Sequence, residues 1–140
     1  MRITTRWAGL LACGLTLLAG SAPAQTIKVG LLNSTSGPFA SLGDQIDKSI
    51  KLYMKENAGK LPPGVKIELI VRDDGGPNPD KAKQLTQELI VRDKPDFLTG
   101  FIWTPNAMSV AALLTESKTP LVIMNAASES CPGVKSVTIV

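Results

Sequence analysis

The sequence predicts an α/β fold, a doubly wound parallel sheet with helices on both faces. Two observations predict it. Short, largely apolar runs are typical of strands buried on both faces, and the segments between them carry apolar residues at helical spacing. Their alternation along the chain favours a parallel sheet. The composition agrees, because 44% of the 140 residues are hydrophobic and 19% are charged, as in an ordinary globular domain.

The apolar runs predict four strands and the beginning of a fifth. The first run, IKVGLL at 27–32, is followed by a stretch dense in turn residues. Similar runs lie at 65–71, 97–100 and 120–124, and residues 137–140 begin the last one. Since a helical segment follows each of the first three strands, we expect the order βαβαβαβ and then a further strand.

Three helices are predicted from apolar residues at helical spacing. The first runs from Asp44 to the Asn57-Ala58-Gly59 segment, and its apolar stripe consists of Ile46, Ile50, Tyr53 and Met54. The second begins with Asn78 as its N-cap and Pro79 as its first residue, and its stripe consists of Ala82, Leu85, Leu89 and Ile90. The third opens at Thr104, and we expect its buried face to carry Met108, Ala111 and Leu114.

Residues 1–24 have the three parts of a secretory signal peptide. A basic start with two arginines precedes an apolar stretch at 8–18, and Ala22-Pro23-Ala24 supplies small residues for cleavage. We therefore predict cleavage after Ala24, so that a mature chain beginning at Gln25 resides in the periplasm. The alternatives are a lipid on Cys13 and a transmembrane anchor, for which the stretch is too short to cross about 30 Å of bilayer.

The residue types present exclude several kinds of chemistry. The chain has no histidine, which removes Ser-His-Asp and Cys-His catalysis and HExxH zinc sites, and its two cysteines are too few for a cysteine-only metal site. Gly30, Gly37 and Gly43 do not form a dinucleotide fingerprint. Without the two arginines of the signal the net charge falls from +3 to +1, so nothing supports a nucleic-acid partner. We expect no enzyme activity, no metal and no cofactor.

Ligands of parallel sheets bind beyond the carboxyl ends of the strands. This selects a functional rim made of the loops at 33–43, 73–78, 101–106 and 125–130. Hydroxyl, amide and small side chains near helix N-termini favour holding a small anion or zwitterion there. We interpret Asp73-Asp74 as a solvated loop that caps and turns the chain. Thr104 is expected to cap the third helix. It either acts only as this cap or also presents its hydroxyl to a ligand. Trp103 is either a core residue or a lid over an apolar ligand.

Five features follow one another behind the signal peptide: IKVG at 27–30, SGPFASLG at 36–43, the segment at 71–82, Gly100, and MNAAS at 124–128. In this order they resemble the type I periplasmic solute-binding proteins of ABC transporters, in the branched-chain amino acid (Leu/Ile/Val) branch. The resemblance implies a two-lobed, hinged receptor that closes on a small ligand. It also implies delivery of that ligand to an ABC permease in the inner membrane.

The resemblance assigns roles to particular residues. In the family, the residues that hold the ligand's carboxylate and ammonium groups occupy positions that match Thr104, Ala126 and Ser128. The ligand's side chain lies against the loop that matches Phe39 to Leu42. The candidate ligand-binding residues are therefore Phe39, Leu42, Trp103, Thr104, Ala126, Ala127 and Ser128.

This sequence departs from the family pattern in ways that leave the ligand open. Leucine-binding relatives often carry an aromatic residue at the position of Leu42, and some join the positions of Gly76 and Trp103 by a disulfide. A branched-chain amino acid, an aromatic acid, an amide and urea are the alternatives, and an exported sensor of a small amide is the alternative function. Because the family has two lobes, we expect residues 25–140 to be an incomplete N-terminal lobe. Cys131 then either lacks its partner or is a free thiol.

Overall fold

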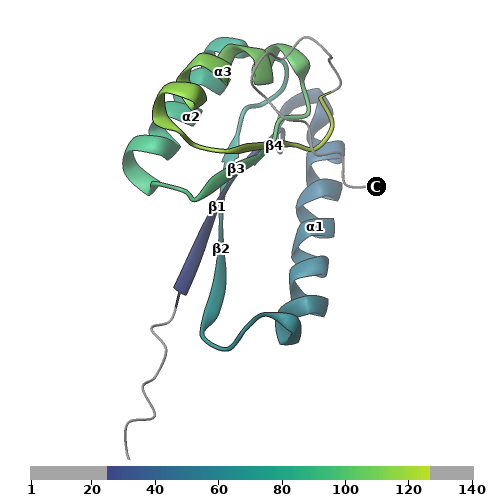
Figure 1. The fold of residues 1–140 in the computed structure, drawn as a ribbon. Coiled ribbons are helices and arrows are strands. Elements are labelled where there is room, and N and C mark those ends of the chain that lie inside the picture. Colours follow the sequence, from purple (N-terminus) through teal and green to yellow (C-terminus); the bar gives the residue numbers. More distant parts are fainter. Residues whose placement is uncertain (1–24, 127–140) are drawn as a thin grey trace, which may run out of the picture.

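A computed structural model describes residues 25–126, and over this range strands alternate with helices as predicted (Figure 1). The strands are β1 (Gln25–Asn33), β2 (Val65–Asp73), β3 (Phe97–Gly100) and β4 (Leu121–Ile123). The helices are α1 (Ala40–Asn57), α2 (Pro79–Glu88) and α3 (Thr104–Ser117), with short helical segments η1 (Gly37–Phe39), η2 (Ala58–Lys60) and the π-helical η3 (Leu89–Asp93). The predicted signal peptide, the predicted fifth strand and Cys131 lie outside the described residues.

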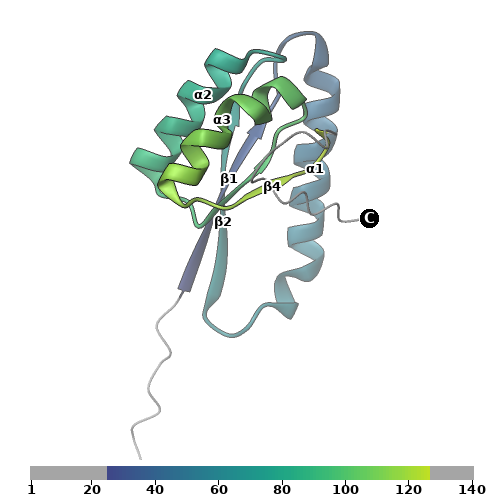
Figure 2. The same ribbon diagram turned by 45° about the horizontal axis from the view of Figure 1, so that its top comes forward.

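The four strands form one parallel sheet in the order β2-β1-β3-β4. The chain passes from β1 outward to β2 and then returns across β1 to β3. Because crossovers between parallel strands are nearly always right-handed, this reversal places the helices on opposite faces. Figures 1 and 2 show α1 on one face and α2 with α3 on the other. The predicted doubly wound fold is confirmed, and its topological switch point lies between the carboxyl ends of β1 and β3.

The hydrophobic core lies between the sheet and the layer formed by α2 and α3. Its buried residues are Leu32, Ala82, Leu89, Leu98, Phe101, Ala107, Val110, Leu114 and Ile123. The predicted start of α2 is confirmed, because the side-chain oxygen of Asn78 accepts a hydrogen bond from the Lys81 N–H at 3.0 Å. The predicted apolar stripe, which continues from α2 into η3, is confirmed too. Ala82 and Leu89 are buried, and Leu85 and Ile90 pack against the core.

Of the predicted buried face of α3, Leu114 is confirmed, Met108 is wrong and Ala111 lies at the margin. Ala107, Val110 and Leu114 are buried, whereas Met108 is 47% exposed and Ala111 is only partly buried. The segment is apolar on most of its circumference, so spacing alone allowed either stripe. The position of α3 beside α2 decides which one is buried (Figure 2).

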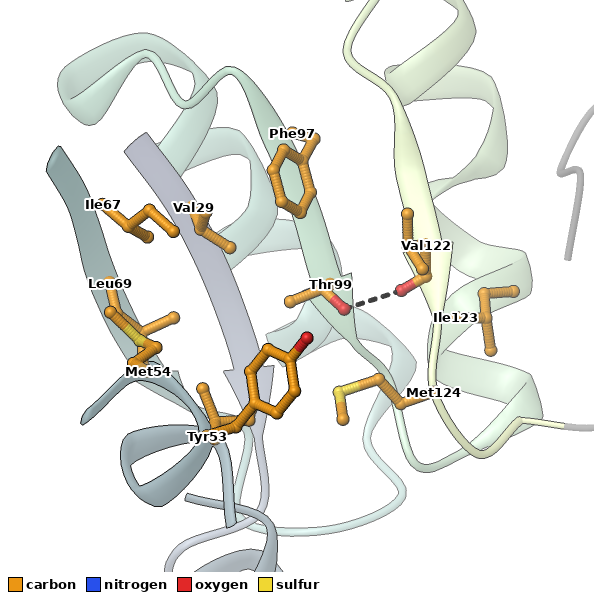
Figure 3. A pocket seen from close by; sticks show the side chains of 11 residues that line it. Val29, Tyr53, Met54, Ile67, Leu69, Phe97, Thr99, Val122, Ile123 and Met124 are labelled. Atoms are coloured by element: carbon orange, nitrogen blue, oxygen red, sulfur yellow. Dashed lines mark hydrogen bonds between the residues drawn. The ribbon is translucent and has the colours of Figure 1, made fainter. Parts of the chain in front are cut away.

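Helix α1 begins at Ala40, earlier than the predicted Asp44, and covers its face of the sheet thinly. Ile46, Ile50 and Met54 are partly buried. Tyr53 is 69% exposed, although it lines the same face of the helix as Ile50 and Met54. An apolar cavity of about 460 Å³ lies between α1 and the sheet (Figure 3). Only α1 lies on this face within residues 25–126, which leaves apolar side chains of the strands uncovered. Within the same range no helix combines the length and the apolar character needed to cross a membrane.

Candidate functional site

Backbone hydrogen bonds around Phe101 fix the ends of three strands at the rim. Phe101 is fully buried, with φ at 57° in the left-handed region. Its N–H donates to the Leu32 carbonyl at 2.9 Å, and its carbonyl accepts from the Ala126 N–H at 3.2 Å. A non-glycine residue with such a φ is held only where its surroundings impose it, and these residues cluster at functional sites. Here it joins the exits of β1, β3 and β4.

Phe39 and Trp103 form an aromatic pair at the switch point. Phe39 ends η1, which follows β1, and Trp103 precedes α3, which follows β3. Their ring centroids are 4.4 Å apart with the planes at 62°, an edge-to-face arrangement. Phe39 is 38% exposed and Trp103 is partly buried, so Trp103 is not a core residue. The aromatic pair therefore presents an apolar surface beside the carboxyl ends of β1 and β3.

The indole of Trp103 belongs to a hydrogen-bond ring. Three side-chain hydrogen bonds join Trp103, Ser34, Asp74 and Asn106, and the backbone from Trp103 to Asn106 closes the ring. The indole N–H donates to Ser34 Oγ at 3.0 Å, and Ser34 Oγ donates to Asp74 Oδ1 at 2.5 Å. Asn106 Nδ2 donates to Asp74 Oδ2 at 2.9 Å. Trp103 and Asn106 both belong to the start of α3, which closes the hydrogen-bond ring.

The position of Asp74 corrects the expectation of a solvated Asp73-Asp74 loop. Asp74 is only 1% exposed, and its Oδ1 also accepts from the Gly76 N–H at 3.0 Å. A buried carboxylate has to be supplied with hydrogen bonds by its neighbours, and here three donors do so. Ser34 and Asn106 are fully buried as well. The exit of β2 is therefore part of the packed interior of the rim.

Asp73, in contrast, turns the chain as predicted. Its Oδ1 accepts from the N–H groups of Thr35 at 2.7 Å, Ser36 at 3.2 Å and Gly75 at 3.0 Å, and its Oδ2 accepts from the Ser36 hydroxyl. Burial acts to raise the pKa of Asp73, but the hydrogen bonds from Ser36, Thr35 and Gly75 outweigh it and hold the pKa below its ordinary value. Asp73 thus ties the loop that leads to Phe39 onto the end of β2.

The other predicted ligand residues are distributed along the same edge. Thr104 is the first residue of α3 and not its cap, because the first intrahelical bond, from the Ala107 N–H, goes to the Trp103 carbonyl at 3.1 Å. Leu42 is 37% exposed on the first turn of α1, and Ala126 is partly buried after β4. Ala127 and Ser128 lie outside the described residues. The ligand contacts of all these residues stay predictions.

Sequence reasoning missed Ser34 and Asn106 and misjudged Asp74. One signal was present for Asn106, because it lies four residues before Val110 and eight before Leu114 and so shares their helical face. A polar residue on a buried face needs a partner, which here is Asp74. No comparable local pattern identifies Ser34, whose partners are 40 and 69 residues away in the chain.

Chemically, the rim is suited to holding a flat apolar group. The aromatic pair supplies ring faces and edges, and Leu42 adds apolar surface near the start of α1. The N-terminus of α3 lies next to the pair and offers a positive helix end for an anionic group. Within residues 25–126, no group of three or more His, Cys, Asp or Glu side chains is arranged to hold a metal ion.

Comparison with known proteins places the chain among binding proteins. The model of the family described as "Periplasmic binding protein" matches residues 26–138. A curated relative, Leu/Ile/Val-binding protein homolog 6 of Brucella abortus, is 38% identical over 115 residues, which are 82% of this chain and 29% of the relative. The chain therefore spans less than a third of the length of that relative.

Two examples represent the solved structures that resemble the described fold. A solute-binding protein of an ABC transporter from R. palustris, in complex with 4-hydroxybenzoate, has a TM-score of 0.71 and 43% identity, over 76% of this chain and 29% of that one. The branched-chain amino acid transporter substrate-binding protein from Streptococcus pneumoniae, in complex with isoleucine, has a TM-score of 0.68 and 25% identity, over 76% of this chain and 31% of that one.

Proposed function

The chain belongs to the periplasmic binding protein family, and we propose that it forms one wall of the ligand cleft of an ABC-transporter substrate-binding protein whose ligand is an aromatic carboxylate. The observation that carries this proposal is the aromatic pair at the switch point. The rings of Phe39 and Trp103 are edge-to-face, with their centroids 4.4 Å apart. Open α/β sheets bind ligands at that point, and a planar ring packs against such a pair in the preferred stacked or edge-to-face geometries.

The carboxylates of the rim favour an acid over an amino acid. An α-amino acid brings an ammonium group, which needs acceptor atoms when it leaves water. The rim has two carboxylates within residues 25–126: Asp74 is only 1% exposed, and Asp73 already accepts four hydrogen bonds from the protein. A benzoate-like ligand has no ammonium group and needs only donors, which the N-terminus of α3 and the Thr104 hydroxyl supply in this proposal.

Similarity to known proteins supports the same class of ligand. The relative bound to 4-hydroxybenzoate is 43% identical to this chain, whereas the relative bound to isoleucine is 25% identical over a similar share of it. Transport completes the proposal. The signal peptide at 1–24 directs the protein to the periplasm, where it delivers the ligand to an ABC permease in the inner membrane. Intact mass of the periplasmic protein, with Gln25 as the expected first residue, tests the export step.

Isothermal titration of the full-length protein tests the ligand class. We expect 4-hydroxybenzoate or benzoate to bind with a micromolar or smaller dissociation constant, which corresponds to a binding free energy of about −8 kcal/mol or one more negative. Leucine and isoleucine should give no measurable heat. Two matched probes separate the contributions: benzamide keeps the ring without the charge, and cyclohexanecarboxylate keeps the charge without the planar ring. Tight binding of leucine together with no binding of any benzoate would overturn the proposal.

A further inference from the structure

We propose that Ser34 and Asp74 are positioning residues that hold Trp103 in one orientation, so that the aromatic pair selects a planar ring over a puckered aliphatic one. This inference rests on the proposed function, because it names what gives the same site its selectivity. Neither Ser34 nor Asp74 is exposed: their exposed fractions are 0% and 1%. They act on the ligand only through Trp103.

The donors and acceptors fix the direction of the chain of bonds. An indole N–H can only donate, so Ser34 Oγ has to accept from Trp103. The single hydroxyl hydrogen of Ser34 then donates to Asp74 Oδ1. Asp74 Oδ2 in turn accepts from Asn106. In the hydrogen-bond ring Trp103 and Asn106 therefore donate, Asp74 accepts, and Ser34 does both.

The hydrogen-bond ring also connects three separate parts of the rim. Ser34 follows β1, and Asp74 follows β2. Trp103 is the N-cap of α3, and Asn106 lies in its first turn. Asn106 Nδ2 donates as well to the Gly76 carbonyl at 3.0 Å, which holds α3 against the loop after β2. Because the backbone of Trp103 is tied to α3 and its indole to Ser34, both ends of the side chain are anchored.

Anchoring matters for selectivity because an immobile side chain is ordered before the ligand arrives. A free Trp103 would lose rotamer freedom on binding, and this ordering weakens binding by an amount equivalent to about three- to tenfold in affinity. The loss should fall mainly on planar ligands, since they gain most from a defined ring geometry. Aliphatic ligands of the same charge depend on Trp103 less and should lose less.

The test is a double-mutant cycle on the full-length protein with two probes, benzoate and cyclohexanecarboxylate. The readout is the ratio of their dissociation constants. We expect Ser34→Ala to reduce the preference for benzoate about three- to tenfold, and Trp103→Phe, which keeps a ring but loses the N–H, to reduce it by a similar factor. Ser34→Ala should add no further loss in the Trp103→Phe background, because its effect passes through the indole N–H.

Ser109→Ala is the matched control. The single hydroxyl hydrogen of Ser109 has two carbonyl acceptors within reach, Asn106 at 2.7 Å and Pro79 at 3.0 Å, so its loss also removes a serine hydrogen bond of α3 without touching Trp103. This variant is expected to keep the ratio of the wild type. If Ser34→Ala does not fold, Asp74→Asn is compared with Ser109→Ala, since it weakens the bonds to Ser34 and Asn106 without changing a residue that contacts the ligand.

A spectroscopic measurement separates failure of this inference from failure of the proposed function. Time-resolved fluorescence anisotropy of the ligand-free protein reports the mobility of Trp103, with Trp103→Phe identifying its share of the emission. We expect faster local motion of the indole in Ser34→Ala than in the wild type or in Ser109→Ala. If the wild type binds no benzoate, the proposed function fails, and the anisotropy still decides whether Ser34 holds the indole. Unchanged anisotropy and an unchanged ratio in Ser34→Ala would overturn the inference.

Discussion

Replacing Gly43 by alanine should destabilise the protein strongly, although alanine is the better helix former. Gly43 lies in the first turns of α1 and is the one buried residue of that helix. A methyl group added at its Cα would lie 1.8 Å from the Ser34 carbonyl oxygen and 2.5 Å from the Ser34 carbonyl carbon. Both are backbone atoms, so no side chain can rotate away to relieve the clash.

The magnitude follows from what has to move. Forcing extra volume into a packed site costs about 1–3 kcal/mol. Separating α1 from Ser34 also breaks the bond from Asn33 Nδ2 to the Gly43 carbonyl, now 2.8 Å long, and leaves a buried donor unpaired at about 1–3 kcal/mol. The better helix propensity of alanine returns about 1 kcal/mol. We therefore expect a net loss of about 1–5 kcal/mol in the free energy of unfolding, centred near about 3 kcal/mol.

Urea denaturation measures this loss, and Gly59→Ala provides a matched control. Gly59 lies in η2, and a methyl group there would have no atom within 4 Å. The control should be neutral or more stable by about 0.4–1 kcal/mol, since alanine restricts the unfolded chain. Gly43→Ala should lower the urea midpoint by about 1–2 M. Equal stability of the two variants would refute the close approach of α1 to Ser34.

Three further predictions test the capping, electrostatic and packing arguments. Asn78→Ala should lower the free energy of unfolding by about 1 kcal/mol, and Asn78→Asp should not, as urea denaturation will show. The folded-state pKa of Asp73 lies below its ordinary value of 3.8, so the stability that it contributes is present above that pH and is lost as the pH falls through the lower folded value. Asp73→Asn should therefore flatten the acid limb of a stability–pH profile below about pH 5, and an unchanged limb would contradict the hydrogen-bond argument. Val110→Ala should lose about 1.6 kcal/mol before any cavity contribution, whereas Met108→Ala should change stability by no more than about 0.5 kcal/mol; the reverse order would restore the face predicted from spacing.

Patterns along the chain predicted most of the fold. Apolar runs, turn residues and the Asn78-Pro79 start are local signals, and they located the four strands and the start of α2 within a few residues. These signals act over a few residues because they depend on backbone conformation and side-chain spacing. The family resemblance rested on the same local segments, which is why it could be recognised without knowledge of the tertiary contacts.

Local patterns failed where the surroundings of a residue come from distant parts of the chain. The nearly uniform apolar character of α3 allowed two buried faces, and packing against α2 selected Val110 over Met108. Asp73 and Asp74 are adjacent in sequence, yet one is partly exposed and the other is buried. Their difference comes from which strand ends meet them, and no property of the dipeptide distinguishes the two.

The alternation of strands and helices, the parallel sheet and the edge that carries the predicted site all follow from hydrophobic periodicity and from the geometry of parallel sheets, so they can be predicted from the sequence. Which residues meet at that edge depends on contacts between distant parts of the chain. The bond between Trp103 and Ser34 joins residues 69 positions apart, and Asp74 is 40 positions from Ser34 and 32 from Asn106. Such contacts form because the order β2-β1-β3-β4 brings the ends of separate strands together, and that order arises from packing the whole sheet and its helices at once.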